Sequence, residues 1–132
     1  MMTKKCQECN KDYDGIYCKP CNSRHFQDNF PNWTSGNANI DNLIQESQLN
    51  ANSQWQFLEW INYSNLKDIQ HIAEGGFGSV YKAIWEDGPT TYKWNDKKSE
   101  WIRKSKTAVV IEKYRNVTSV TSEFLDKVKK LE

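Results

Sequence analysis

Four cysteines near the start of the chain have the type and spacing of a metal site. Cys6 and Cys9 form one C-x-x-C pair, Cys18 and Cys21 form a second, and eight residues separate the two pairs. A C-x-x-C turn presents two thiolates to one ion, and structural zinc takes four such ligands at about 2.3 Å. Because four thiolates leave no coordination position for water, the pattern predicts a structural zinc site rather than a catalytic one.

Disulfides and a redox-active pair are the two alternatives for these cysteines. The N-terminal segment is basic and lacks the apolar run of a secretory signal, so we expect the cytoplasm or the nucleus, where thiols stay reduced. A redox pair would not need a second copy. His25 is a candidate replacement ligand, although its sequence context favours a surface position.

The segment between the two cysteine pairs contains a turn signal. Asp14-Gly15, flanked by Tyr13 and Ile16, predicts a hairpin that folds the two cysteine turns onto each other. Four thiolates on one divalent ion leave a net negative charge. The basic residues close enough in sequence to offset it are Lys4, Lys5, Lys19 and Arg24.

A second candidate site is a glycine-rich stretch between two predicted strands, residues 66–73 and 80–85. Glycines let backbone amides approach phosphate oxygens without a Cβ in the way. A plain hairpin, whose glycines only serve the turn geometry, is the alternative. A dinucleotide-binding fold is excluded because it needs a helix after the glycines. The stretch reads Glu74-Gly75-Gly76-Phe77-Gly78-Ser79.

The remaining patterns complete a prediction of an α+β chain. Apolar residues near a 3.6 period predict a helix over residues 40–49, capped by Asn39 or Asp41. Residues 90–106 are predicted as a long polar connection, residues 107–114 as a third strand, and residues 121–131 as a helix. We therefore expect a four-cysteine zinc knuckle in residues 1–25, a helical linker in residues 26–64, and a sheet with one large helix in residues 65–132.

Several segments together carry a family resemblance. They are Trp33-Thr34-Ser35-Gly36-Asn37, Ile40-Asp41, Ile44-Gln45, Leu58-Glu59-Trp60-Ile61, and the glycine stretch with its flank Gly78-Ser79-Val80-Tyr81-Lys82-Ala83. With these segments the chain resembles an expanded family of fungal protein kinases of the tyrosine-kinase-like group, whose members also start with paired C-x-x-C motifs. The resemblance covers essentially the whole chain. It implies a protein-kinase-like N-terminal lobe (a twisted antiparallel sheet plus one large helix) and ATP-dependent protein phosphorylation.

The resemblance also implies roles for individual residues. In the kinase loop G-x-G-x-x-G-x-V, Ala73 stands at the first glycine position, and Gly75 and Gly78 stand at the second and third. Phe77 would cap the tip of the loop and Val80 would cover the adenine. The residues that the resemblance implies for nucleotide binding, with ATP and Mg as ligands, are Ala73, Gly75, Gly76, Phe77, Gly78, Val80 and Val110.

The chain departs from the family at the ion pair that supports the phosphates. In the family, a Lys on the third strand holds the phosphates and pairs with a Glu on the next helix. Here Glu112 stands at the lysine position and Lys127 at the glutamate position. Strand alternation places Val110 and Glu112 on the nucleotide side, so we expect a swapped ion pair that keeps the architecture and weakens ATP binding. The alternative is a bulged strand in which Lys113 serves as the phosphate ligand.

Further features limit the functions that are compatible with the sequence. The sequence contains neither H-R-D nor D-F-G, the motifs of the catalytic base and of a magnesium ligand, so we expect this polypeptide alone not to transfer phosphate. A catalytically dead module for protein contacts is the alternative function. A net charge of +1 makes nucleic acid an unlikely partner, and no apolar stretch reaches the roughly 20 residues of a membrane helix. An uncovered sheet face predicts a protein partner or self-association.

Overall fold

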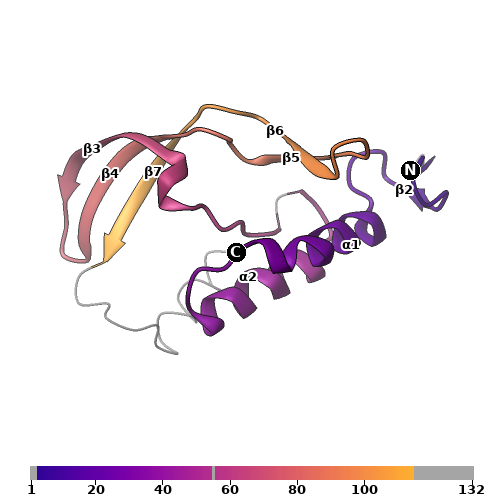
Figure 1. The fold of residues 1–132 in the computed structure, drawn as a ribbon, viewed down its shortest axis with the longest axis horizontal. Helices are drawn as coiled ribbons and strands as arrows, with labels where there is room; N and C mark the ends of the chain where they lie inside the picture. The colour runs from indigo at the N-terminus through magenta and orange to yellow at the C-terminus, as the bar shows by residue number, and fades with distance from the viewer. Residues whose placement is uncertain (1–2, 55, 115–132) are drawn as a thin grey trace. The chain divides into compact units, whose positions relative to one another are not determined.

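The computed structural model describes residues 3–54 and 56–114 (Figure 1). The chain divides into two compact units, of which the first runs to Trp60 and the second begins at Ile61. Within the described residues the fold is mixed α+β, as the sequence predicts, with two α-helices and antiparallel strands. The helix predicted at residues 121–131, together with Lys127, lies outside the described residues. Across the described ranges, no helix has the length and apolar character that a bilayer crossing needs.

The first unit opens with a small hairpin. Strand β1 (Lys4–Lys5) pairs antiparallel with β2 (Asp12–Tyr13). The chain reverses at the first C-x-x-C turn, where the Cys6 amide donates to the Lys11 carbonyl over 2.9 Å and the Asn10 amide donates to the Cys6 carbonyl over 2.8 Å. The hairpin turn therefore surrounds the first cysteine pair.

The prediction of a hairpin at Asp14-Gly15 was wrong. Gly15 does adopt a positive φ of 86°, but the Asp14 carboxylate accepts from the amides of Ile16 and Tyr17, each over 2.8 Å. A side chain that bonds backbone amides two and three residues ahead forms a local turn without needing paired strands. This turn directs the chain from β2 into the helix that follows.

Helix α1 (Lys19–Asn29) is an element that the sequence did not predict. It begins directly after Cys18 with Pro20 in its first turn, a position where the missing amide proton of proline costs nothing. The helix crosses residue 25, where the sequence placed the end of the knuckle. Its last turn continues into a short 3-10 helix, η1 (Phe30–Asn32).

Helix α2 (Ala38–Asn50) matches the helix predicted over residues 40–49. Its N-terminal cap is Asn37, whose side-chain oxygen accepts from the amides of Asn39 and Ile40 at 2.9 and 3.2 Å. Neither predicted cap residue has this role. Asp41 instead accepts from the Ser35 amide, over 2.8 Å, and from the Ser35 hydroxyl, over 2.6 Å, which fixes the approach to the helix.

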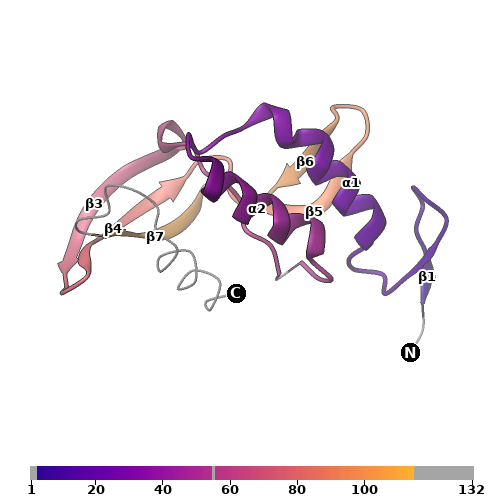
Figure 2. The same cartoon turned by 90° about the horizontal axis from the view of Figure 1, so that it is seen from below.

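The core of the first unit lies between α1 and α2, which run side by side in Figure 2. Phe26 of α1 is 3% exposed and packs against Phe57 with ring centroids 4.8 Å apart. Leu43 and Ile44 supply the buried face of α2. The Ser23 hydroxyl also donates to the Leu49 carbonyl over 3.3 Å, so α1 and α2 are joined by contacts outside the cysteine cluster.

The second unit is built on a three-stranded antiparallel sheet in the order β3-β4-β7. A short 3-10 helix, η2 (Tyr63–Asn65), leads into β3 (Leu66–Glu74), which is followed by β4 (Gly78–Trp85) and later by β7 (Thr107–Tyr114). Figure 2 shows the three strands next to each other. The strands predicted at residues 66–73, 80–85 and 107–114 are confirmed.

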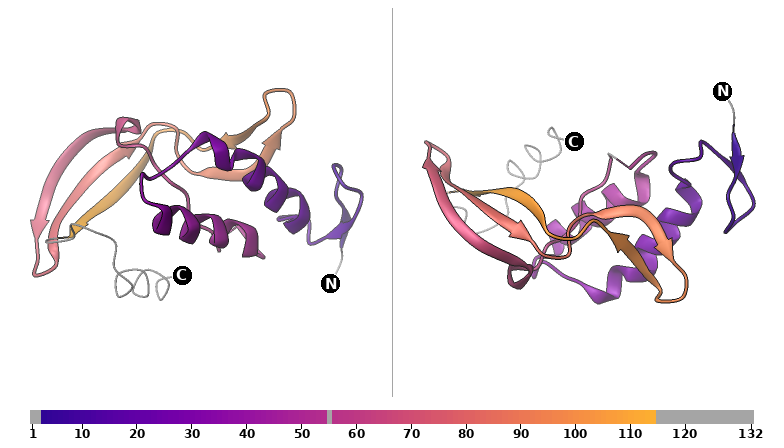
Figure 3. Two further views of the ribbon diagram at one scale, coloured as in Figure 1. Left: turned by 60° about the horizontal axis from the view of Figure 1, so that its bottom comes forward. Right: turned by 90° about the horizontal axis from the view of Figure 1, so that it is seen from above.

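A hairpin occupies residues 90–103, where the sequence predicted a long polar connection over residues 90–106. Strand β5 (Thr90–Asn95) pairs antiparallel with β6 (Glu100–Arg103), visible as the orange hairpin in both views of Figure 3. Trp94 lies directly opposite Trp101, and their rings meet edge to face with centroids 5.2 Å apart. Facing aromatic pairs of this kind stabilise antiparallel strands.

The Gly88→Ala substitution is expected to destabilise the second unit by at least about 2 kcal/mol. Gly88 has a φ of +69°, and a Cβ there would lie 2.6 Å from the Ser105 backbone nitrogen. The positive φ alone costs about 1–2 kcal/mol for an L-residue, and the backbone clash adds to that cost. Urea titration read by amide exchange in β4 measures the effect.

Gly36→Ala in the first unit is the matched control for the clash. Gly36 has a similar φ of +85°, but a Cβ there would meet nothing within 4 Å. It should cost only the conformational penalty of about 1–2 kcal/mol, read by amide exchange in α2. Equal costs at Gly36 and Gly88 would show that the close contact with Ser105 does not exist in solution.

Candidate functional site

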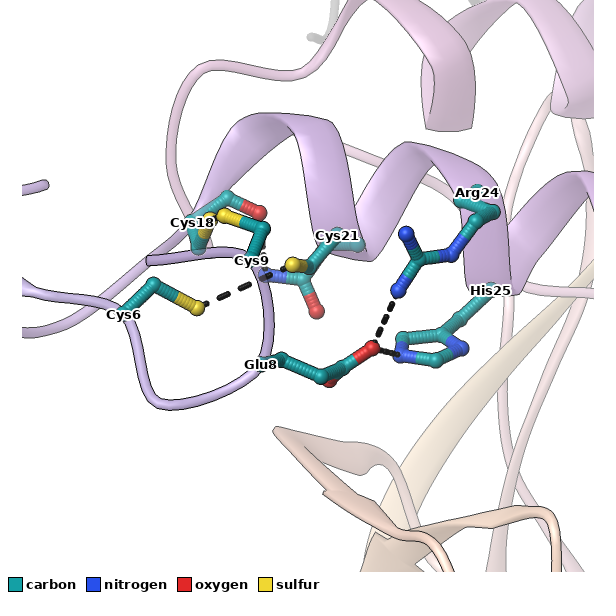
Figure 4. Close-up of polar contacts among 8 residues, drawn as sticks. Cys6, Glu8, Cys9, Cys18, Cys21, Arg24 and His25 are labelled. Atoms are coloured by element: carbon teal, nitrogen blue, oxygen red, sulfur yellow. Dashed lines mark hydrogen bonds and ion pairs between the residues drawn. The ribbon is translucent and has the colours of Figure 1, made fainter. Parts of the chain in front are cut away.

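The four predicted cysteines come together in the first unit (Figure 4). Their Sγ atoms all lie within 4.8 Å of one another, and the Cys6–Cys21 and Cys9–Cys18 sulfur pairs are each 3.7 Å apart. A tetrahedron with zinc–sulfur bonds of about 2.3 Å has sulfur–sulfur edges of about 3.8 Å. A disulfide would need about 2.05 Å, and all four thiols are free. The four cysteines are thus positioned to bind a metal ion, and the geometry is compatible with zinc.

Two different local structures deliver the sulfur atoms. Cys6 and Cys9 lie in the turn of the β1–β2 hairpin, whereas Cys18 precedes α1 and Cys21 lies in its first turn. Each 3.7 Å pair joins one C-x-x-C turn to the other. The buried residues of this cluster are three of the cysteines themselves, with Cys9 and Tyr13 packed against them. An ion at its centre would therefore serve as the core of the hairpin.

The protonation of the thiols links metal binding to pH. Burial opposes ionisation of Cys6, but hydrogen bonds from the backbone of Cys9 and Glu8, with those from the Cys18 and Cys21 thiols, lower its pKa to about 7. Burial raises the pKa of Cys18 and of Cys21 above the ordinary value. An ion must displace protons from these thiols, so binding releases protons and the affinity falls as the pH falls.

Next to the sulfur atoms lies a charged cluster, of which the sequence predicted only the counter-charge of Arg24. The carboxylate of Glu8 accepts a hydrogen bond from the Arg24 guanidinium, and Glu8 Oε2 lies 2.7 Å from His25 Nε2 (Figure 4). His25 is only 6% exposed, so its predicted surface position was wrong. It is also not part of the group of four ligands. Helical spacing was the available signal, since Arg24 and His25 follow Cys21 by three and four residues on one helix face.

The basic residues near the cysteines have different partners. Loss of hydration opposes the charge of Arg24, but the negative charges of Cys21 and Glu8 raise the pKa of its guanidinium. Lys5 pairs with Asp12 over 2.9 Å, and Lys19 donates to the Asn52 side chain over 2.8 Å. Of these three predicted counter-charges, Arg24 is therefore the one that interacts with the cluster.

The glycine-rich stretch of the second unit forms the tight turn between β3 and β4. The Gly75 amide donates to the Gly78 carbonyl over 2.8 Å, and the Gly78 amide donates to the Gly75 carbonyl over 3.3 Å. Gly78 has a φ of 151°. The Phe77 ring folds over Gly75, where a Cβ would lie 2.8 Å from it. The predicted strand–turn–strand is confirmed. Gly76 and Phe77 lie at the tip of the turn, between β3 and β4.

The register of β4 and β7 brings the predicted face residues together. Val80 lies opposite Glu112, and Lys82 lies opposite Val110. Because directly opposite residues share a face, the side of the sheet that carries Val80 also carries Val110 and Glu112, and Val110 is 67% exposed. On the neighbouring strand β3, Ala73 lies opposite Val80.

Lys113 lies on the other face of the sheet. It pairs with Ser79, one residue out of step with Val80 and Glu112. The β4–β7 ladder continues without a register shift from Gly78 to Trp85, so the bulge that the Lys113 alternative requires is not there. The register shifts of this sheet lie between β3 and β4 instead.

Carboxylates occupy both flanks of the glycine turn. Glu112 accepts from the Tyr114 hydroxyl over 2.8 Å, which raises the pKa of Tyr114. Glu74 accepts from the Ser79 hydroxyl over 2.7 Å and lies 2.7 Å from His71 Nε2. The turn is therefore flanked by two carboxylates, and Lys82, opposite Val110, is a cation on the same face as Glu112.

Comparison with protein-family models, with curated proteins and with solved structures finds no match to this chain. Its function must therefore be inferred from the distances within the cysteine cluster and from the register around the glycine turn.

Proposed function

We propose that the first unit is a structural zinc module and that the second unit is the small lobe of a protein-kinase-like protein. In the first unit, four thiols at the spacing of a tetrahedral site support zinc. In the second, the observation that carries the proposal is the shared face of Val80 and Val110 beside the Gly75–Gly78 turn. Two apolar side chains at this position would hold the adenine of ATP, as the family resemblance implies.

Glu112 weakens the binding of nucleotide phosphates at this face. It is exposed and shares the face of Val110, where the resemblance implies a phosphate-binding lysine. At an effective dielectric of about 20, a unit-charge contact at 4 Å is worth about 4 kcal/mol, and screening by salt reduces that figure at an exposed position. We infer that adenine binding is retained and that phosphate binding is lost.

The alternative function is a catalytically dead module for protein contacts. The bond from Tyr114 to Glu112 favours it, because this carboxylate already has a partner within its own strand. Under this alternative the exposed side chains, such as Phe77 and Val110, belong to a protein interface. A swapped ion pair between Glu112 and Lys127 is compatible with both functions.

Calorimetric titration of the full chain with adenosine and with Mg-ATP separates the two functions. If the face of Val80 and Val110 binds nucleotides, binding should be weak, and adenosine should bind at least as tightly as Mg-ATP. The reason is that the Glu112 carboxylate repels the phosphates, which adenosine lacks. Mg-ATP binding as tight as that of an active kinase would contradict the role of Glu112. If neither ligand binds at millimolar concentration, the protein-contact alternative holds.

A further inference from the structure

We propose that Glu8 is the positioning residue of the cysteine cluster: it fastens the first C-x-x-C turn to helix α1, so that the four thiols stand at metal-binding distance. The proposal rests on the structural zinc site proposed above. It adds a residue that is not a ligand and gives it a role in metal affinity.

The architecture of the first unit requires a contact that holds the hairpin to helix α1. The Cys6–Cys9 turn belongs to a hairpin whose strands are two residues long each, and isolated hairpins are marginal in water even with longer strands. Cys21 lies on an eleven-residue helix that has its own packing through Phe26. The hairpin must therefore be held to the helix by something besides its own strand pairing.

Glu8 provides a direct link between these two parts. It lies inside the first C-x-x-C turn, and its Oε2 atom contacts both Arg24 and His25 of α1. The side chain of His25 is 8% exposed and that of Glu8 is 26% exposed, so the contact between them is largely shielded from water. An electrostatic contact that is shielded from water is weakened less by solvent than one at the surface, and the Arg24 guanidinium adds a charged hydrogen bond to the same carboxylate.

Arg24 adds a charge argument to the same contact. Its guanidinium donates a hydrogen bond to the Glu8 carboxylate, and Arg24 follows Cys21 by three residues on helix α1, so a positive charge stands beside the sulfur cluster (Figure 4). Four thiolates around a divalent ion keep a net negative charge, which this cation offsets. Groups that orient ligands from outside the coordination sphere typically contribute about 10- to 100-fold to metal affinity.

The hairpin also contains a matched control. Asp12 pairs with Lys5 over 2.9 Å, and their side chains are 61% and 66% exposed. An exposed ion pair of this kind contributes little. Asp12→Asn removes the same charge from the same hairpin as Glu8→Gln, but it leaves the contact with α1 intact.

Cobalt titration of the full chain, with zinc affinity measured by competition against a chelator, tests the proposal. Cobalt reports the ligand set through its sulfur charge-transfer and d–d bands. Glu8→Gln should weaken metal binding about 10- to 100-fold with an unchanged four-sulfur spectrum, whereas Asp12→Asn should change the affinity less than about twofold. Arg24→Gln should resemble Glu8→Gln, and the double variant should lose little more than either single one.

The outcomes separate this proposal from the zinc site itself. If the wild-type chain shows no four-sulfur cobalt spectrum, the zinc site is wrong. If the wild-type spectrum is as expected but Glu8→Gln binds like Asp12→Asn, the positioning role is wrong. Additive losses in the double variant would also overturn it. Should Glu8→Gln fail to fold at saturating metal, Arg24→Lys, which keeps the cation, must bind more tightly than Arg24→Gln.

Discussion

Removal of the metal ion is expected to unfold the β1–β2 hairpin and leave α2 folded. The hairpin is joined to the start of α1 by a cluster whose buried residues are three of the four cysteines, whereas the buried face of α2 is formed by Leu43 and Ile44. Structural zinc supplies about 10–16 kcal/mol of apparent binding free energy in zinc-finger peptides at pH 7. Under reducing conditions, a strong chelator should therefore abolish exchange protection of the Cys6 and Asn10 amides.

The same experiment contains its own controls. The α2 amides report the helix pair, and the β4 amides report a separate unit, so both should keep their protection in chelator. Cys9→Ser should reproduce the chelator effect without any chelator, because it removes one of the four thiols that are positioned to bind the ion. Protected Cys6 and Asn10 amides in the metal-free chain would contradict the view that the ion forms the core of the hairpin.

Glu112→Lys is expected to tighten Mg-ATP binding at least about tenfold, which corresponds to about 1.4 kcal/mol. The substitution replaces a carboxylate by an ammonium group on the face that carries Val80 and Val110. Under the proposed function, repulsion of the phosphates becomes attraction, while the proposed adenine contacts at Val80 and Val110 are unaffected. The order of affinities should reverse, so that Mg-ATP binds more tightly than adenosine in calorimetric titration.

Two further variants show whether the effect belongs to this face. Glu112→Gln should give an intermediate Mg-ATP affinity, because it removes repulsion without adding attraction. Lys113→Glu changes charge on the opposite face and should leave the affinity nearly unchanged. An unchanged affinity in Glu112→Lys would show that phosphates do not approach this position.

The cysteine cluster was predictable because its signal is local. The spacing of two C-x-x-C pairs names all four ligands, and all four come together. The register of β7 was also predictable, since strict alternation along a strand puts Val110 and Glu112 on one side. What the sequence could not show was the partner of Glu8, which depends on how the first cysteine turn lies against α1.

Two elements escaped prediction for a shared reason. Helix α1 contains few apolar residues apart from Cys21 and Phe26, so it lacks the 3.6-residue periodicity that indicates a helix. The β5–β6 hairpin is polar along most of its length, and its pairing is interrupted between Thr90 and Lys93. In both cases a small number of contacts, such as Trp94 with Trp101, decides the structure.

The position of the first hairpin turn has a different explanation. Asp14-Gly15 is a strong turn signal, and a turn does form there through the Asp14 carboxylate. The strands, however, pair across the six-residue segment from Cys6 to Lys11. The Asp-Gly preference applies to short hairpin loops. It cannot predict a longer turn, such as the one that contains Cys6 and Cys9.

X-ray absorption at the zinc edge of the purified full chain tests the central claim most directly. A single zinc ion per chain, surrounded by four sulfur atoms at about 2.3 Å, is the predicted result. Nitrogen or oxygen atoms in place of sulfur, or a metal-free chain whose cysteines have joined in disulfides, would contradict the account.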